Sequence, residues 1–200
     1  RMAKAAGGIF LYAAIVLDEL QPRLPRLPDL DRYPLPEGLS GLYHDFLNRE
    51  LGRDEDRWYE RFKPVLGLIA VAQGDGLTAR QLGAVTGKEV EQTLRICRQY
   101  LSGELPEGPF RIFHQSLSDF LLEDDRNLDY HIDAPAMHQE IADYFLGLHG
   151  GKWQECKDRY ALAYTVAHLA ETVRQTKDAL RRAEHREKLA RPLSEWGVLE

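Results

Sequence analysis

Leu77-Thr78-Ala79-Arg80-Gln81-Leu82 and Val85-Thr86-Gly87-Lys88-Glu89-Val90 are the two stretches that decide the fold. Each places a Thr three residues before Gln or Glu and brackets the pair with apolar residues, which is the pattern of an N-terminal capping box with a hydrophobic staple. The sequence therefore predicts two helix starts, at Thr78 and Thr86. A short helix, a tight turn and a second helix that runs to Leu101 would form a helix-turn-helix.

The segment that follows predicts a β hairpin and a third helix. Residues 104–114 contain turn-forming Pro and Gly and end in the β-prone run Phe110-Arg111-Ile112-Phe113, so we expect the hairpin wing of a winged helix. Ser116 and Asp119 have the spacing of a capping pair. The helix that they begin is expected to bury Leu117, Phe120 and Leu121.

Three apolar patterns upstream predict helices over residues 4–20, 40–52 and 58–73, the second capped by Ser40. Pro64 lies inside the third pattern and must kink or split it, because proline lacks a backbone donor. Residues 21–38 hold five prolines and predict an extended linker. The residues expected to be buried are Ile9, Phe10, Ala13, Val16, Leu17 and Leu20 in the first helix, and Leu39, Leu42, Tyr43, Phe46 and Leu47 in the second.

The remainder of the chain predicts paired helices. The first covers residues 136–148, and the second includes residues 162–173, before a charged segment at 180–189. Such pairs are typical of a helical linker or of the start of a repeat array. The expected inward residues are Ile141, Tyr144, Phe145 and Leu148 in the first helix, and Leu162, Val166, Leu169 and Val173 in the second.

Composition narrows the class of protein. Of the 200 residues, 44% are hydrophobic, which is enough for a core, and the net charge of −6 with both signs interspersed predicts no nucleic-acid or lipid partner. No run of 18 uncharged apolar residues is present, so we expect no membrane span. Cys97 and Cys156 are far apart and favour a reducing compartment, the cytoplasm. The chain begins inside an apolar pattern at Arg1 and ends at Glu200 without a domain boundary, so we expect a fragment of a longer protein.

Three segments resemble successive landmarks of the NACHT-type STAND ATPases, in the same order. They are Gly8-Ile9-Phe10-Leu11-Tyr12-Ala13, Leu35-Pro36-Glu37-Gly38-Leu39 leading into Leu42-Tyr43, and the run from Phe110 to Leu121 that contains Phe113-His114-Gln115-Ser116. Tyr160 to Leu169 is similar to the helical linker that often precedes a WD-repeat propeller or another repeat sensor.

The resemblance implies a mainly α fold in three parts. Residues 1–52 would be the helical domain that follows a missing ATPase core, 53–132 a winged helix-turn-helix with a small β wing, and 133–200 a helical linker or the start of helical repeats. The chain departs from the family at Gly7-Gly8-Ile9, where a Gly-x-Pro near the adenine is usual, and at Leu117, where an aromatic residue is common.

The implied function is that of a switch. ADP would hold the ATPase core against the winged helix, and exchange for ATP would release the core so that subunits oligomerise and signal. In this family pattern His114 matches the winged-helix histidine that contacts the β-phosphate of ADP. The expected partners are the ATPase core and a repeat sensor in the same chain, and protein partners on oligomerisation. ADP or ATP with Mg²⁺ would be cofactors of the full-length parent.

This chain itself is expected to have no catalysis, no metal and no cofactor, because it contains no Gly-x-x-x-x-Gly-Lys-Ser/Thr phosphate loop. Gly83-Ala84-Val85-Thr86-Gly87-Lys88-Glu89 imitates one but is a residue short and ends in Glu. The run 125–129 imitates the opening of a calcium loop, yet Tyr130 and Ala136 occupy the positions that need Gly and Glu.

Other interpretations remain open from the residues alone. His114 could be a packed or capping histidine. The whole chain could be a winged-helix DNA-binding regulator with a helical oligomerisation tail, with the helix from Thr86 to Leu101 in the major groove. A hydrolase would need Ser116 or Cys156 in a pocket beside a histidine, such as His168 for the thiol.

Overall fold

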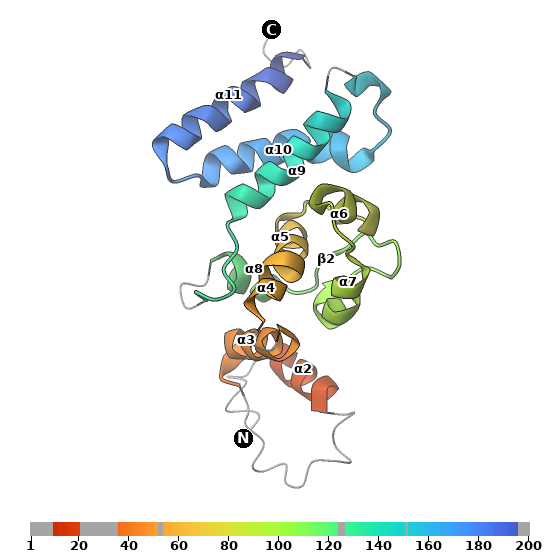
Figure 1. Ribbon diagram of the computed structural model, residues 1–200, viewed down its shortest axis with the longest axis vertical. Helices are drawn as coiled ribbons and strands as arrows, with labels where there is room; N and C mark the ends of the chain where they lie inside the picture. Colours follow the sequence, from red (N-terminus) through yellow and green to blue (C-terminus); the bar gives the residue numbers. More distant parts are fainter. Residues whose placement is uncertain (1–9, 21–35, 52–53, 124–126, 151, 196–200) are drawn as a thin grey trace.

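The computed structural model describes residues 10–20, 36–51, 54–123, 127–150 and 152–195. These residues are mainly helical, with a single two-stranded sheet among them. The predicted mainly α class is therefore confirmed. Figure 1 shows three tiers along the long axis, with α2 and α3 at one end, α4 to α8 in the middle, and α9 to α11 at the other end.

The first tier is the pair of α2 (Phe10–Leu20) and α3 (Gly38–Leu51). The predicted buried face of α2 is confirmed at Val16 but wrong at Phe10 and Leu17, which are 86% and 56% exposed. Beside Val16, the helix buries Tyr12 and Ile15. Tyr12 fixes this rotation, since its hydroxyl donates to the carbonyl of Pro36 at 2.6 Å. Residues 4–9 of the predicted helix and residues 21–35 of the predicted linker lie outside the described residues.

The second helix matches its predicted face but not its predicted start. Leu42, Tyr43, Phe46 and Leu47 are buried, as expected. The helix begins at Gly38, so Ser40 lies inside its first turn and is not the cap.

Pro64 splits the third predicted helix, as expected. The chain forms α4 (Glu55–Arg57), a π-helical turn η3 (Trp58–Phe62) and α5 (Lys63–Val71), with the proline in the first turn of α5. Because proline cannot donate a hydrogen bond and crowds the preceding turn, the helix widens there. The amide of Lys63 accordingly donates to the carbonyl of Trp58, five residues back. Helix α5 is the centre of the core, and its Leu68 is fully buried.

The first predicted capping box is confirmed. In α6 (Ala79–Thr86), the hydroxyl of Thr78 accepts from the Gln81 amide at 3.1 Å and the Gln81 side chain accepts from the Thr78 amide at 2.9 Å. The second box is wrong. Thr86 is the last residue of α6, and its hydroxyl donates to the carbonyl of Leu82 at 2.8 Å. Gly87 then ends the helix in the left-handed conformation, with φ 66°.

The second helix of the pair is shorter than predicted. Helix α7 (Glu91–Cys97) starts five residues after Thr86 and is followed by a 3₁₀ turn, η4 (Arg98–Tyr100). Leu101, the predicted helix end, instead opens strand β1 (Leu101–Ser102). The helix cannot continue here because the backbone pairs with the second strand instead. The amide of Phe113 also donates to the carbonyl of Tyr100 at 2.8 Å.

The predicted hairpin forms from two very short strands. Strand β1 pairs antiparallel with β2 (Arg111–Ile112), and an isolated bridge joins Leu77 to Phe110 beside them. This bridge brings the chain before α6 against the hairpin. Gly76 makes the approach possible, because at its φ of 96° a Cβ would collide with the carbonyl oxygen of Phe110. The hairpin leads into α8 (Gln115–Leu122), which buries Leu117, Phe120 and Leu121 as predicted.

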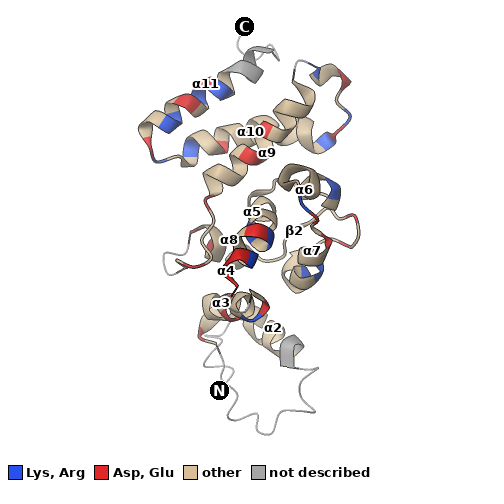
Figure 2. Cartoon of the chain, viewed as in Figure 1, with Lys and Arg blue, Asp and Glu red and all other residues tan. Residues whose placement is uncertain are grey.

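The third tier contains α9 (Ala134–His149), the 3₁₀ turn η5 (Trp153–Glu155), α10 (Arg159–Gln175) and α11 (Ala179–Glu195). Helix α10 packs on both α9 and α11 (Figure 1). In α9 the predicted Ile141 and Phe145 are fully buried, whereas Leu148 is 57% exposed, contrary to prediction. Figure 2 shows basic and acidic residues interspersed along α11.

The predicted face of α10 is also rotated. Leu169 is buried, but Leu162 is 43% exposed, and the buried row is largely polar. Threonines can occupy that row because their hydroxyls donate to carbonyls one turn back, Thr165 to Ala161 at 2.7 Å and Thr172 to His168 at 3.0 Å. Among the described residues, none of the helices is both long and apolar enough to cross a membrane.

Candidate functional site

His114 lies where the hairpin turns into α8. Its backbone is extended, with φ −133° and ψ 131°, and its Nδ1 accepts from the amide of Ser116 at 3.2 Å. His114 is therefore the N-cap of α8, which was one of the interpretations that the sequence left open. The prediction that Ser116 caps this helix is wrong. Ser116 is inside the helix because the imidazole nitrogen already satisfies its amide.

Ser116 extends this contact into a short relay. Its Oγ lies 2.7 Å from His114 Nδ1 and 2.8 Å from the hydroxyl oxygen of Tyr43. Because a backbone amide always donates, the neutral ring must keep Nδ1 unprotonated as the acceptor. Ser116 then donates to Nδ1, Tyr43 donates to Ser116, and the imidazole proton is on Nε2. We call Tyr43, Ser116 and His114 the tyrosine relay.

Tyr43 anchors the relay in the core. It comes from α3, it is only 1% exposed, and its ring packs against Tyr100 and Phe120 with centroids 5.6 Å from each. Burial raises the pKa of Tyr43, although the Ser116 hydrogen bond acts in the opposite direction. The phenol therefore stays a donor at neutral pH. The relay ties the first tier to the start of α8.

The His114 ring has one donor that the relay does not use. The His114 side chain is exposed, and its Nε2 carries the proton in the arrangement above. The ring stands at the N-terminus of an eight-residue helix, where backbone amides and the helix dipole favour negative charge. An imidazole N–H at such a place can donate to a phosphate or carboxylate oxygen.

A second histidine arrangement, missed by the sequence reasoning, lies inside the third tier. His138 of α9 and His168 of α10 face each other with their Nδ1 atoms 2.7 Å apart. His168 Nε2 lies 2.8 Å from the hydroxyl of Tyr160, which accepts from the amide of Gln73 at 2.9 Å. We call His138, His168, Tyr160 and the Gln73 amide the histidine chain.

Burial dominates the electrostatics of the histidine chain. It lowers the pKa of His138 to about 4 and that of His168 to about 3, while Glu171 opposes the shift in both. Both rings are therefore neutral at pH 7. A signal for His138 was present in the sequence, since it continues the row of Ile141 and Phe145 at helical spacing. Its partner is 30 residues away, so pairing could not be read from spacing.

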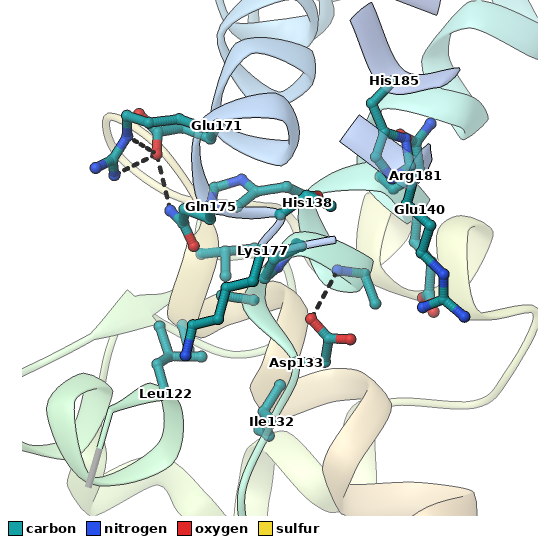
Figure 3. A pocket seen from close by; sticks show the side chains of 18 of the residues that line it. Leu122, Ile132, Asp133, His138, Glu140, Glu171, Gln175, Lys177, Arg181 and His185 are labelled. Atoms are coloured by element: carbon teal, nitrogen blue, oxygen red, sulfur yellow. Dashed lines mark hydrogen bonds and ion pairs between the residues drawn. The ribbon is translucent and has the colours of Figure 1, made fainter. Parts of the chain in front are cut away.

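A cavity of about 1300 Å³ opens beside this chain. The end of α5, the end of α8, the start of α9 and the junction between α10 and α11 line it, and His138 is part of its wall (Figure 3). Glu171 holds Arg174 at 2.6 Å and Gln175 at 2.8 Å on one side. Side chains of both signs line the space, so its electrostatics favour no single class of ligand.

Comparison with known proteins identifies no related protein. No family model, no curated protein and no solved structure matches this chain. The function has to be argued from the residues and their geometry.

The remaining sequence candidates have structural partners. Asp119 accepts from Gln115 at 2.9 Å, so the described contacts do not join it to His114 as a triad would require. Ser116 does lie beside His114, but it does not line the cavity. Cys156 donates from Sγ to the carbonyl of Asp158 at 3.7 Å, and His168 is engaged in the histidine chain instead.

The two imitated motifs are explained in the same way. Residues 83–86 of the phosphate-loop imitation are helical, and Lys88 Nζ donates to the carbonyl of Glu60. Residues 125 and 126 of the calcium-loop imitation lie outside the described residues. Asn127 uses its amide structurally, donating to the carbonyl of Phe120 at 2.7 Å and accepting from the Tyr130 amide at 3.0 Å. Within the described residues, no group of three His, Cys, Asp or Glu side chains could hold a metal ion.

Proposed function

We propose that this chain is the regulatory and interaction module of a nucleotide-switch ATPase of the NACHT/STAND type, with no catalysis of its own. In this proposal 1–52 is a helical domain, 53–132 a winged helix and 133–200 a helical linker toward a sensor. The observation that carries it is the exposed imidazole of His114, fixed through Nδ1 and free to donate through Nε2.

The order of elements in the middle tier supports the winged-helix interpretation. Helix α5 is followed by the bridge residue Leu77, then by α6 and α7, and then by β1 and β2. A winged helix has this order, with one short strand before the helix-turn-helix and a hairpin after it. The bridge from Leu77 to Phe110 provides the contact expected between that strand and the wing.

The tyrosine relay supports a switching role for His114. A β-phosphate contact exists only when the ATPase core is closed against the winged helix, so it contributes differential free energy to the closed state. Pre-orientation by Ser116 lowers the entropic cost of that contact, because the ring is already held. Through Tyr43, the relay also connects the α2–α3 pair to the same ring.

The charge distribution argues against the DNA-binding alternative. Arg95 of α7 is bound to Glu91 at 2.6 Å, and Lys88 donates to a backbone carbonyl, so neither is held ready for a phosphate. Figure 2 shows acidic side chains next to basic ones in the middle tier. A DNA-binding helix needs several unopposed cations on one face.

The gene sequence upstream of Arg1, together with the nucleotide content of the purified full-length protein, tests this proposal. We expect a strand, a phosphate loop and a helix upstream, and ADP released from the purified protein on denaturation. An upstream sequence without a phosphate loop contradicts the proposal, as does a full-length protein that neither carries nor binds adenine nucleotide.

The isolated chain gives a complementary test. We expect it neither to bind ATP or ADP tightly nor to hydrolyse them, because a single imidazole contributes only a small part of a nucleotide's binding energy. Calorimetry that gave a dissociation constant of about 1 μM or below for this chain alone would contradict the assignment of the nucleotide site to a separate core.

A further inference from the structure

The contact between His138 and His168 has room for only one proton. Their Nδ1 atoms are 2.7 Å apart, and the ring centroids are 5.0 Å apart. At this distance one nitrogen must donate and the other must accept, because two N–H groups would repel each other and two lone pairs would form no bond. The two rings are 3% and 0% exposed, so bulk water does not substitute for the missing partner.

The backbone determines which ring donates. The amide of Gln73 can only donate, so the hydroxyl oxygen of Tyr160 accepts from it. If His168 Nε2 donated to Tyr160 instead, the Tyr160 hydrogen would have no acceptor among the described residues, so Tyr160 donates to His168 Nε2 at 2.8 Å. His168 must then carry its proton on Nδ1 and donate it to His138, whose remaining proton is on Nε2 at the cavity wall. The whole histidine chain runs in one direction, from Gln73, just after α5, through α10 to α9.

One added proton leaves one hydrogen of this chain without an acceptor. If His138 is protonated, its Nδ1 becomes a donor, and His168 has to accept there and move its own proton to Nε2. That N–H then points at Tyr160, whose hydroxyl hydrogen loses its acceptor while its oxygen already receives the Gln73 amide. A buried donor without a partner is costly, so the protonated chain favours separation of the helices.

The groups around the pair do not remove this sensitivity. On α10, Glu171 favours protonation, but it is itself occupied by Arg174 and Gln175, and Arg174 acts in the opposite direction on His138. Glu140 of α9 and Arg181 and His185 of α11 also line the cavity beside His138. These side chains include acidic and basic groups, so together they do not favour one protonation state of His138. From the segment after α5, the histidine chain receives the Gln73 amide as a donor, which disfavours a further donor at Tyr160.

We infer that the histidine chain is an acid-sensitive latch, which holds α9 on α10 and both on the end of α5 at neutral pH and releases them on acidification. The cavity beside His138 gives the incoming proton and water a route. The latch is independent of the nucleotide switch proposed above, because it uses none of the residues of the tyrosine relay.

Proton–nitrogen correlation spectra of the imidazole rings test the latch directly. In this 200-residue chain at about pH 7.5, we expect His168 to carry its proton on Nδ1 and His138 on Nε2. The Nδ1–H form is the less common tautomer of free histidine, so the result for His168 is diagnostic. Two Nε2–H rings would mean that no proton lies between them and would overturn the inference.

Acid sensitivity provides the functional readout. The folding equilibrium constant, measured by urea unfolding, is expected to fall on the order of several thousandfold more in the wild type than in the double variant His138→Gln/His168→Gln between about pH 7.5 and 4.5, because each histidine contributes about a hundredfold. His131→Gln is the matched control, because His131 also lines the cavity but is outside the chain. It should keep the wild-type pH dependence. Equal pH dependence in the wild type and the double variant would contradict the latch.

Regional hydrogen exchange keeps the inference testable if the double variant does not fold. In the wild type near pH 5, α9 and α10 should lose protection before α3 and α8, after correction for the intrinsic pH dependence of exchange. Simultaneous loss of protection in all four helices would contradict a latch confined to the third tier.

Discussion

The tyrosine relay and the histidine chain contain the same kinds of side chain but differ in their exposure to solvent. In both, a backbone amide fixes the direction of a series of hydrogen bonds that includes a tyrosine hydroxyl, the Ser116 amide at His114 and the Gln73 amide at Tyr160. At the start of α8 the His114 ring is exposed, so its Nε2–H is accessible from solvent. Between α9 and α10 the rings of His138 and His168 are buried, so their hydrogen-bond partners all belong to the protein. The protonation of these rings therefore affects the stability of the fold. The difference between the two arrangements is therefore one of burial and not of residue type.

Among single substitutions at neutral pH, removing the buried ring should give the largest effect. His168→Ala leaves a cavity and deprives both His138 Nδ1 and the Tyr160 hydroxyl of their partners, so we expect the free energy of unfolding to fall by about 3–5 kcal/mol. The matched change at the exposed site, His114→Ala, removes only an N-cap and should cost about 1 kcal/mol in the isolated chain. Urea unfolding of both variants measures the contrast. Equal losses would remove the distinction between the two sites.

The pH dependence of stability should come from the buried pair. Burial lowers the pKa of His138 to about 4 and of His168 to about 3, from an unfolded value of 6.5. With depressed folded pKa values, the stability is fully present above pH 6.5 and is lost as pH falls toward 4, because only the unfolded chain takes up protons there. We expect a loss of about 5–6 kcal/mol over that window, roughly half from each histidine, visible in thermal melting. A flat profile from pH 7 to 5 would contradict burial as the cause.

The tyrosine relay should contribute less to stability than the histidine chain. Tyr43→Phe keeps the ring contacts with Tyr100 and Phe120 but leaves Ser116 without its donor, so we expect a loss of about 1 kcal/mol. Tyr59→Phe is the control, since Tyr59 is 57% exposed, and should change stability by less than about 0.5 kcal/mol. Chemical denaturation of the two variants decides. A Tyr43→Phe protein as stable as the control would show that the relay does not join α3 to α8.

DNA binding should show the smallest effect of all. Because Arg95 is paired with Glu91 and Lys88 donates to a backbone carbonyl, we expect no sequence-specific complex and only salt-sensitive association. A gel shift that survives about 0.2 M salt would revive the DNA-binding alternative.

The parts of the fold that local chemistry determines could be predicted from the sequence. The capping box of Thr78 and Gln81 and the interruption at Pro64 depend on neighbours within five residues, and both were predicted correctly. The second capping box did not form although its sequence pattern matched. The Thr86 hydroxyl donates to a carbonyl inside α6, and Gly87 ends that helix. Identical local patterns thus have competing uses.

The parts that depend on tertiary partners could not be predicted. The apolar residues of α2 surround most of the helix, so the side that faces α3 was not encoded in its spacing, and Tyr12 decided it. In α10 threonines take the buried row, which an apolar pattern cannot indicate. His114 was singled out through a family resemblance, and its role as N-cap required the structure.

The affinity of ADP for the full-length protein carrying His114→Ala tests the central claim most directly. Charge-assisted hydrogen bonds contribute on the order of 1.5–3 kcal/mol, and each 1.4 kcal/mol is tenfold in an equilibrium. We therefore expect ADP to bind roughly ten- to a hundredfold more weakly and the resting protein to oligomerise without a signal. Gln115→Ala, at the exposed neighbouring position, should leave both properties unchanged. Unchanged ADP affinity and an unchanged resting oligomeric state in His114→Ala would contradict the switch role.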